Sequence, residues 1–239
     1  MSRSVIILFC VIVGVYSVQY PEITPCFEYD SACLTRTSNI LYKMSVAGDP
    51  SLNIENLDPM FQKRIDGNLA TIKYTFHNTT LKGFNECTVV NSKLNLKKST
   101  LKFDLFCPTF KMYGQYDVTG RLIVVPMEGN GDYSILCKDY NIHIDTEIKF
   151  IEKNGVRYMA YKTFKVDGDL EGKMVTELTN LFNGQYEELA AFVLRFINTN
   201  WKPVSKELQG PVFYANVRRL IKNFNKFLKR IPFDQLIAQ

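Results

Sequence analysis

The sequence predicts an α+β protein in which a long C-terminal helix is wrapped by a strongly curved antiparallel β-sheet. Three observations carry this prediction. The middle of the chain alternates apolar and polar residues with the two-residue period of strands. The last third spaces its apolar residues three and four apart, which is the helical period. A helix of that length with so aromatic a stripe needs an equally long partner, and a curved sheet provides one.

The N-terminus has the pattern of a secretion signal. The apolar run over residues 5–18 is short for a membrane span, which takes roughly 20 residues. It has the length of a signal-peptide core, and Val15 and Ser17 are acceptable small residues before a cleavage point. We expect residues 1–17 to be removed, Cys10 among them, and residues 18–239 to form a single soluble extracellular domain. A retained anchor is the alternative.

Helix and strand signals then follow in order. Asp30 is expected to cap a helix that begins near Ser31 and ends before Gly48. Segments with the strand period run over residues 72–77, 88–96, 101–105, 112–126, 132–152 and 156–166. Turn signals lie between them at residues 78–83, 128–131 and 154–155. This order predicts an antiparallel meander of long strands.

The helical period governs the C-terminal third. It begins at Met174, is interrupted at residues 183–184 and continues to Ile197. Pro203 then marks the start of one long helix that Pro211 should kink. The face opposite the apolar stripe is basic and carries Arg218, Arg219, Lys222, Lys226, Lys229 and Arg230.

The charge distribution and the absence of catalytic motifs reduce the number of possible function classes. The net charge of +5 comes from this C-terminal face and is not spread over the chain, which argues against nucleic-acid binding. The basic face is either simply solvated or a transient contact for a membrane or a receptor. His77 and His143 are expected to face solvent, and residues 167–169 to form a charged turn. No nucleophile elbow, zinc helix or phosphate loop is found, so we expect no catalysis, no metal and no cofactor.

Six segments together resemble the insect takeout and haemolymph juvenile-hormone-binding protein family. They run in the family's order along the mature chain: PCFEYDSACL, LDPM, GQYDVTGRLIVVPMEGNGDYSI, TNLFNG, FINTNWK and IPFDQLI. The resemblance implies a TULIP-like fold with an elongated hydrophobic tunnel between helix and sheet. It also implies a secreted carrier of juvenile hormone, isoprenoids or fatty molecules in haemolymph or another extracellular fluid, with no catalytic activity. A monomer is the default expectation.

The resemblance leaves the ligand open. The hormone carriers proper have a second bridge to the C-terminal helix, whereas this sequence has no cysteine after Cys137. The chain is therefore more similar to the takeout proteins, whose ligands are diverse. The alternative to a carrier is an extracellular signalling or immune module with a filled core, which would bind a receptor or membrane through its surface.

The resemblance gives the aromatic residues a second interpretation besides filling the core. We expect large side chains on the core-facing sides to line the tunnel, with a tyrosine hydroxyl as the polar contact. The expected lining residues are Tyr74, Phe76, Phe103, Tyr116, Tyr133, Phe182, Phe192, Phe196, Phe213, Leu220, Phe224 and Phe227.

The cysteines and one asparagine complete the predictions. Cys26 and Cys33 match the family's N-terminal pair and would staple the chain onto the first helix. Cys87 and Cys107 either pair or remain buried thiols, because spacing alone does not decide connectivity. Cys137 is expected to be a buried free thiol. Asn78 begins an Asn-Thr-Thr glycosylation acceptor.

Overall fold

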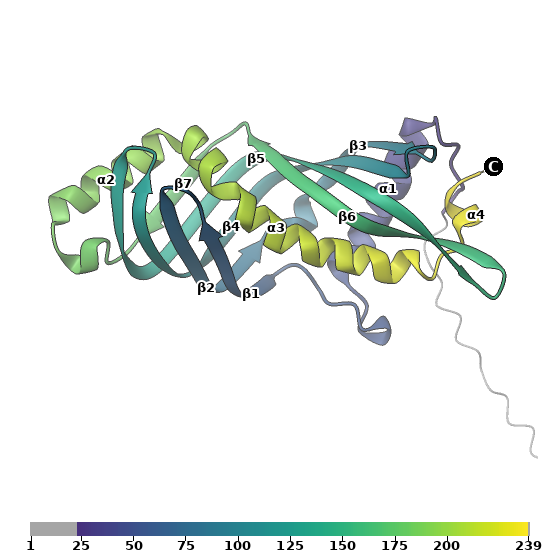
Figure 1. Cartoon of the computed structure of the whole chain (residues 1–239), viewed down its shortest axis with the longest axis horizontal. Helices are drawn as coiled ribbons and strands as arrows, with labels where there is room; N and C mark the ends of the chain where they lie inside the picture. The colour runs from purple at the N-terminus through teal and green to yellow at the C-terminus, as the bar shows by residue number, and fades with distance from the viewer. Residues whose placement is uncertain (1–22, 239) are drawn as a thin grey trace, which may run out of the picture.

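The computed structural model describes residues 23–238, so the predicted signal peptide and Cys10 lie outside the described part of the chain. Figure 1 shows an elongated molecule in which a long helix follows the length of a curved sheet. The strands are β1 (Met60–Asn68), β2 (Ile72–Lys82), β3 (Thr88–Asn95), β4 (Thr100–Leu122), β5 (Val125–Lys153), β6 (Val156–Leu170) and β7 (Met174–Leu178). The helices are α1 (Ser31–Ala47), η1 (Pro50–Leu52), η2 (Phe84–Glu86), η3 (Phe182–Gly184), α2 (Glu187–Thr199), α3 (Trp201–Leu228) and α4 (Phe233–Leu236).

Two very long strands hold the sheet together. β4 has 23 residues and β5 has 29, and they pair antiparallel along their length. β2 and β3 share the free edge of β4, while β6 and β7 share that of β5. The sheet is antiparallel and open, with the order β1-β2-β4-β5-β6. The predicted α+β class with its curved antiparallel sheet is therefore observed.

Helices cover the sheet at both ends and along its length. α3 runs along β6, α1 packs on β3, and α2 packs on β7 at the opposite end of the molecule (Figure 1). The Asp30 carboxylate caps α1 as expected, because it accepts a hydrogen bond from the Cys33 amide at 2.9 Å. The apolar side chains of both layers meet between the sheet and α3, and the core follows the long axis.

Two of the three predicted turns in the sheet region are wrong, whereas residues 154–155 do connect β5 to β6. Residues 78–83 do not turn the chain, because β2 continues to Lys82 through an irregularity at Asn78, where φ is 47°. Residues 128–131 lie inside β5, and the chain instead reverses at Ile123 and Val124. Glycines predicted to make a turn are used for close packing, which local sequence rules do not distinguish.

Three other boundaries also differ from the predictions. Residues 174–178 form strand β7, not the start of a helix, because they pair with β5. Residues 167–169 lie in β6, not in a turn. α3 begins at Trp201, two residues before Pro203, since a proline in the first turn of a helix removes no hydrogen bond.

Candidate functional site

The main cavity lies between the sheet and α3. Its empty space measures about 1150 Å³, part of it open to solvent. Side chains of β2, β4, β5 and β7 line it from the sheet side, and those of α2 and α3 close it from the helix side. Nearly all of these side chains are aliphatic or aromatic, so the cavity offers an apolar molecule a dry environment.

Four of the expected lining residues contribute to this cavity. Tyr74, Phe76, Tyr116 and Phe213 all face it. Two hydroxyls at its wall are already paired, since Tyr74 donates to the Leu208 carbonyl and Tyr116 to the Thr179 carbonyl, both at 2.7 Å. The rings therefore offer apolar surface, and their polar tips stabilise the wall.

A second, smaller cavity lies near α1 and the C-terminus. Its empty space measures about 480 Å³, part of it open to solvent, and Phe103 and Phe224 line it together with Tyr161. These three rings form a cluster in which the Phe103 and Phe224 centroids are 5.8 Å apart. The two cavities share no lining residue, so the elongated apolar interior that the resemblance implied holds two separate spaces.

The other expected lining residues have different positions. Tyr133, Phe182, Leu220 and Phe227 are buried but line neither cavity. The prediction that Phe192 lines the tunnel is wrong, because this residue is 56% exposed. Val193 and Ile197 occupy the inward stripe of α2, which turns Phe192 outward and leaves Phe196 half-buried.

Sequence reasoning missed the polar residues of the cavity. Ser205, Gln209 and Asn216 project from α3, Tyr140 from β5, and Thr176 from β7. One signal was present, because Ser205 and Gln209 fall on the same helical face as Phe213 at four-residue spacing. The lining residues were predicted from aromatic character, which Ser205 and Gln209 lack.

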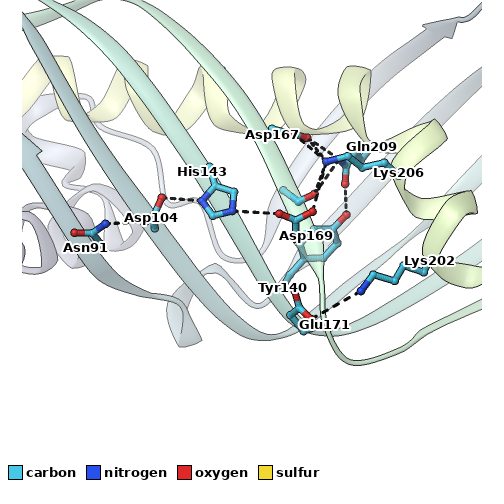
Figure 2. Close-up of polar contacts among 11 residues, drawn as sticks. Asn91, Asp104, Tyr140, His143, Asp167, Asp169, Glu171, Lys202, Lys206 and Gln209 are labelled. Atoms are coloured by element: carbon cyan, nitrogen blue, oxygen red, sulfur yellow. Dashed lines mark hydrogen bonds and ion pairs between the residues drawn. The ribbon is translucent and has the colours of Figure 1, made fainter.

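A polar network fixes the Gln209 side chain at the cavity wall (Figure 2). The Gln209 amide nitrogen donates to Asp167 at 2.8 Å and to the Gly168 carbonyl at 3.0 Å. Its amide oxygen accepts from the Tyr140 hydroxyl at 2.5 Å. Lys206 in turn pairs with Asp167 at 2.9 Å. The amide nitrogen and the amide oxygen of Gln209 therefore both have hydrogen-bond partners within the protein.

The same network extends across the outer face of the sheet. His143 contacts Asp104 at 2.8 Å and Asp169 at 3.4 Å. The hydrogen bond to Asp104 raises the pKa of His143, and the hydrogen bond from Lys206 lowers the pKa of Asp167. His143 faces solvent as expected, and the exposed charges lie on the side of the sheet away from the apolar interior.

Buried ionisable groups at the main cavity are held neutral. Burial raises the pKa of the Cys137 thiol to about 12 and that of the Tyr140 hydroxyl well above its ordinary value. Cys137 is the free thiol among the described residues, as expected, and it lines the cavity.

Both cysteine pairs that the sequence suggested are bonded. Cys26 is joined to Cys33, and Cys87 to Cys107. The Cys26 amide also donates to the Leu236 carbonyl at 3.0 Å, so this disulfide ties the C-terminal segment to α1 beside the second cavity.

Within residues 23–238, His, Cys, Asp and Glu form no group of three or more that could hold a metal ion. In the same range, no helix is long and apolar enough to cross a membrane.

A curved antiparallel sheet around a long C-terminal helix, with an apolar interior, defines the TULIP-like class of folds. Within that class, the family model for haemolymph juvenile hormone binding protein matches residues 5–238, and the chain belongs to this family. The crystal structure of Takeout 1 from Epiphyas postvittana is similar, with a TM-score of 0.83 and 29% identity, covering 91% of this chain and all of that one.

Curated relatives agree with this assignment. The circadian clock-controlled protein daywake of Drosophila melanogaster is 23% identical over 90% of this chain and 86% of its own length. Its counterpart in Drosophila yakuba is 22% identical over 88% of this chain and 85% of its own length.

Proposed function

We propose that this protein is a secreted, monomeric carrier of an elongated lipophilic molecule such as juvenile hormone, an isoprenoid or a fatty-acid-like lipid. The main cavity is the observation that carries the proposal. Its walls are apolar and its hydroxyls are largely paired within the protein, so binding is driven by burial of the ligand's surface at about 25 cal/mol per Å². Membership of the haemolymph juvenile hormone binding protein family supports the same role.

Native mass spectrometry of the secreted protein tests this proposal. A lipophilic molecule should co-purify at near one-to-one ratio and be identified after organic extraction. Leu178→Trp should abolish this adduct, because Leu178 lines the cavity. Val175→Trp is the matched control, since Val175 lies on the outward face of the same strand. A ligand-free mass that does not change after exposure to juvenile hormone, isoprenoids and fatty acids would contradict the proposal.

Secretion has its own test at Asn78. The residue is exposed on β2, where its side chain is accessible to glycosylation. Protein secreted by insect cells should lose mass on enzymatic deglycosylation, and Asn78→Gln should remove that mass difference.

A second candidate function is contact with an anionic membrane during ligand loading. Lys162, Arg218, Lys222, Lys226 and Lys229 line one surface groove between β6 and α3. Part of the predicted basic face is already used within the protein, because Arg219 pairs with Glu55 and Lys226 donates to the Asn53 carbonyl. The remaining charge matches the phosphate and carboxylate groups of anionic lipids.

Vesicle co-sedimentation tests the membrane contact. Binding to vesicles that contain phosphatidylserine should weaken as salt rises, since the attraction is electrostatic. Lys222→Glu should weaken it further, whereas Lys149→Glu, an exposed change on β5, should have less effect. Absent or salt-independent binding would contradict this role and would direct attention to a receptor.

A further inference from the structure

Thr176 places an unpartnered hydroxyl at the wall of the main cavity. The residue lies in the middle of β7, faces inward with Met174 and Leu178, and is 7% exposed. Its Oγ1 has no hydrogen-bond partner. Ser45 and Asn223 hold the other buried polar atoms without partners among the described residues, and neither residue lines this cavity. A buried hydroxyl without a hydrogen-bond partner is unfavourable, so a ligand atom that bonds to Thr176 would remove this cost.

The neighbouring polar side chain does not form a hydrogen bond with the Thr176 hydroxyl. Asn198 is the neighbouring polar side chain, and its amide is committed to the backbone. It accepts from the Thr176 amide at 2.7 Å and donates to the Thr176 carbonyl at 2.9 Å and the Leu194 carbonyl at 3.1 Å. This clamp holds the Thr176 backbone in place while the hydroxyl remains free.

The charge of the lining restricts what can bind there. Among the described residues, no lysine, arginine, histidine, aspartate or glutamate lines the main cavity. An ionised carboxylate buried there would have no cation to pair with, and an unpaired buried charge is strongly unfavourable. A neutral oxygen needs only one hydrogen-bond partner, and Thr176 supplies it.

We propose that Thr176 anchors the polar end of the ligand through a hydrogen bond to one neutral oxygen, in a hydroxyl, ester, ketone or ether. The cavity therefore selects neutral lipids over ionised fatty acids. This inference rests on the proposed carrier function and narrows the class of molecule carried.

Displacement of the apolar fluorescent probe N-phenyl-1-naphthylamine tests the anchor. Hexadecan-1-ol, methyl hexadecanoate and hexadecanoate have matched chains and differ in the polar end. At pH 8 the two neutral lipids should displace the probe at least tenfold more effectively than the carboxylate. Thr176→Val, which keeps the shape and removes the hydroxyl, should weaken the binding of hexadecan-1-ol about fivefold, after the displacement is corrected for the variant's own affinity for the probe.

Two further variants make the result specific. Thr176→Ser retains a hydroxyl and should retain most of the preference for the alcohol. Thr88→Val is the same chemical change at an exposed position on β3 and should have no effect. Equal displacement by hexadecanoate, or an unchanged alcohol affinity in Thr176→Val, would overturn the anchor. Failure of the probe and all three lipids to bind the unmodified protein would instead overturn the carrier function itself.

Discussion

Gly131 shows how one residue can be misread from its neighbours. It lies within β5, and a Cβ added there would come 2.5 Å from the Thr179 carbonyl oxygen and 2.7 Å from the Thr179 hydroxyl. That hydroxyl accepts from the Asp132 amide at 2.8 Å, which holds the segment against the strand. The glycine is needed for this close approach between segments, and no turn is involved.

Gly131→Ala should therefore destabilise the protein by about 1–3 kcal/mol, because the new methyl group meets backbone that cannot move away. Urea unfolding of the purified protein measures the change. Asn130→Ala, an exposed change one residue earlier, should stay within about 0.5 kcal/mol of the unmodified protein. Equal stability of the two variants would refute this account of Gly131.

At the scale of elements, the orientation of α2 on the sheet determines which of its apolar residues are buried. The helix is apolar on more than one side, but it packs on β7, and its Val193 is fully buried. Phe192 is adjacent in sequence and lies about 100° around the helix, and solvent reaches it. Aromatic character predicted the wrong member of the pair because periodicity alone does not locate the partner surface.

Substitutions in this pair should have opposite consequences. Val193→Ala should cost about 2 kcal/mol through lost burial, and Phe192→Ser should change the free energy of unfolding by less than about 0.5 kcal/mol. Thermal unfolding of both variants tests the orientation of α2, and a larger loss for Phe192→Ser would show that the helix is rotated.

The start of α1 depends on a single carboxylate. Asp30→Ala should cost about 1 kcal/mol, because the Cys33 amide loses its acceptor. Asp30→Asn keeps an oxygen at that position and should recover most of the loss in the same urea assay. If Asp30→Asn is as unstable as Asp30→Ala, the negative charge is the stabilising feature and the hydrogen bond is not.

For the whole molecule, burial of ionisable groups in the apolar interior makes the free energy of unfolding fall at alkaline pH. Burial raises the pKa of Cys137 from near 9 to about 12. Between these values the unfolded thiol has lost its proton while the folded thiol retains it, so the unfolded state binds fewer protons. The contribution of Cys137 to the free energy of unfolding is therefore intact below pH 9 and falls as pH rises toward 12.

Cys137→Ala should remove this contribution. From pH 9 upward, the unmodified protein should lose stability faster than the variant by roughly 1.4 kcal/mol per pH unit. Urea unfolding of both proteins between pH 8 and 10.5 measures the difference. The buried tyrosines contribute equally to both proteins except Tyr140, whose pKa the neighbouring Cys137 helps to raise. Parallel curves would mean that Cys137 is reached by solvent.

Much of the architecture was predictable, because periodicity reports local geometry. The capped first helix, the long strands and the C-terminal helix each follow from residue spacing, and the class of fold follows from their order. The turn at Ile123 and Val124 was not predictable, since two β-branched apolar residues have no local turn preference. Pairing between β4 and β5 extends almost to those residues and leaves them as the loop.

The amino-acid sequence by itself determined the element types, the apolar interior and the six segments that mark the family. The tertiary structure alone decided how that interior is used. It divided the space into two cavities, turned Phe192 outward, and committed Gln209 and Asn198 to other partners while leaving the Thr176 hydroxyl free. The physical reason is that hydrogen-bond partners and cavity walls come from residues far apart in the chain, whereas periodicity reports only near neighbours.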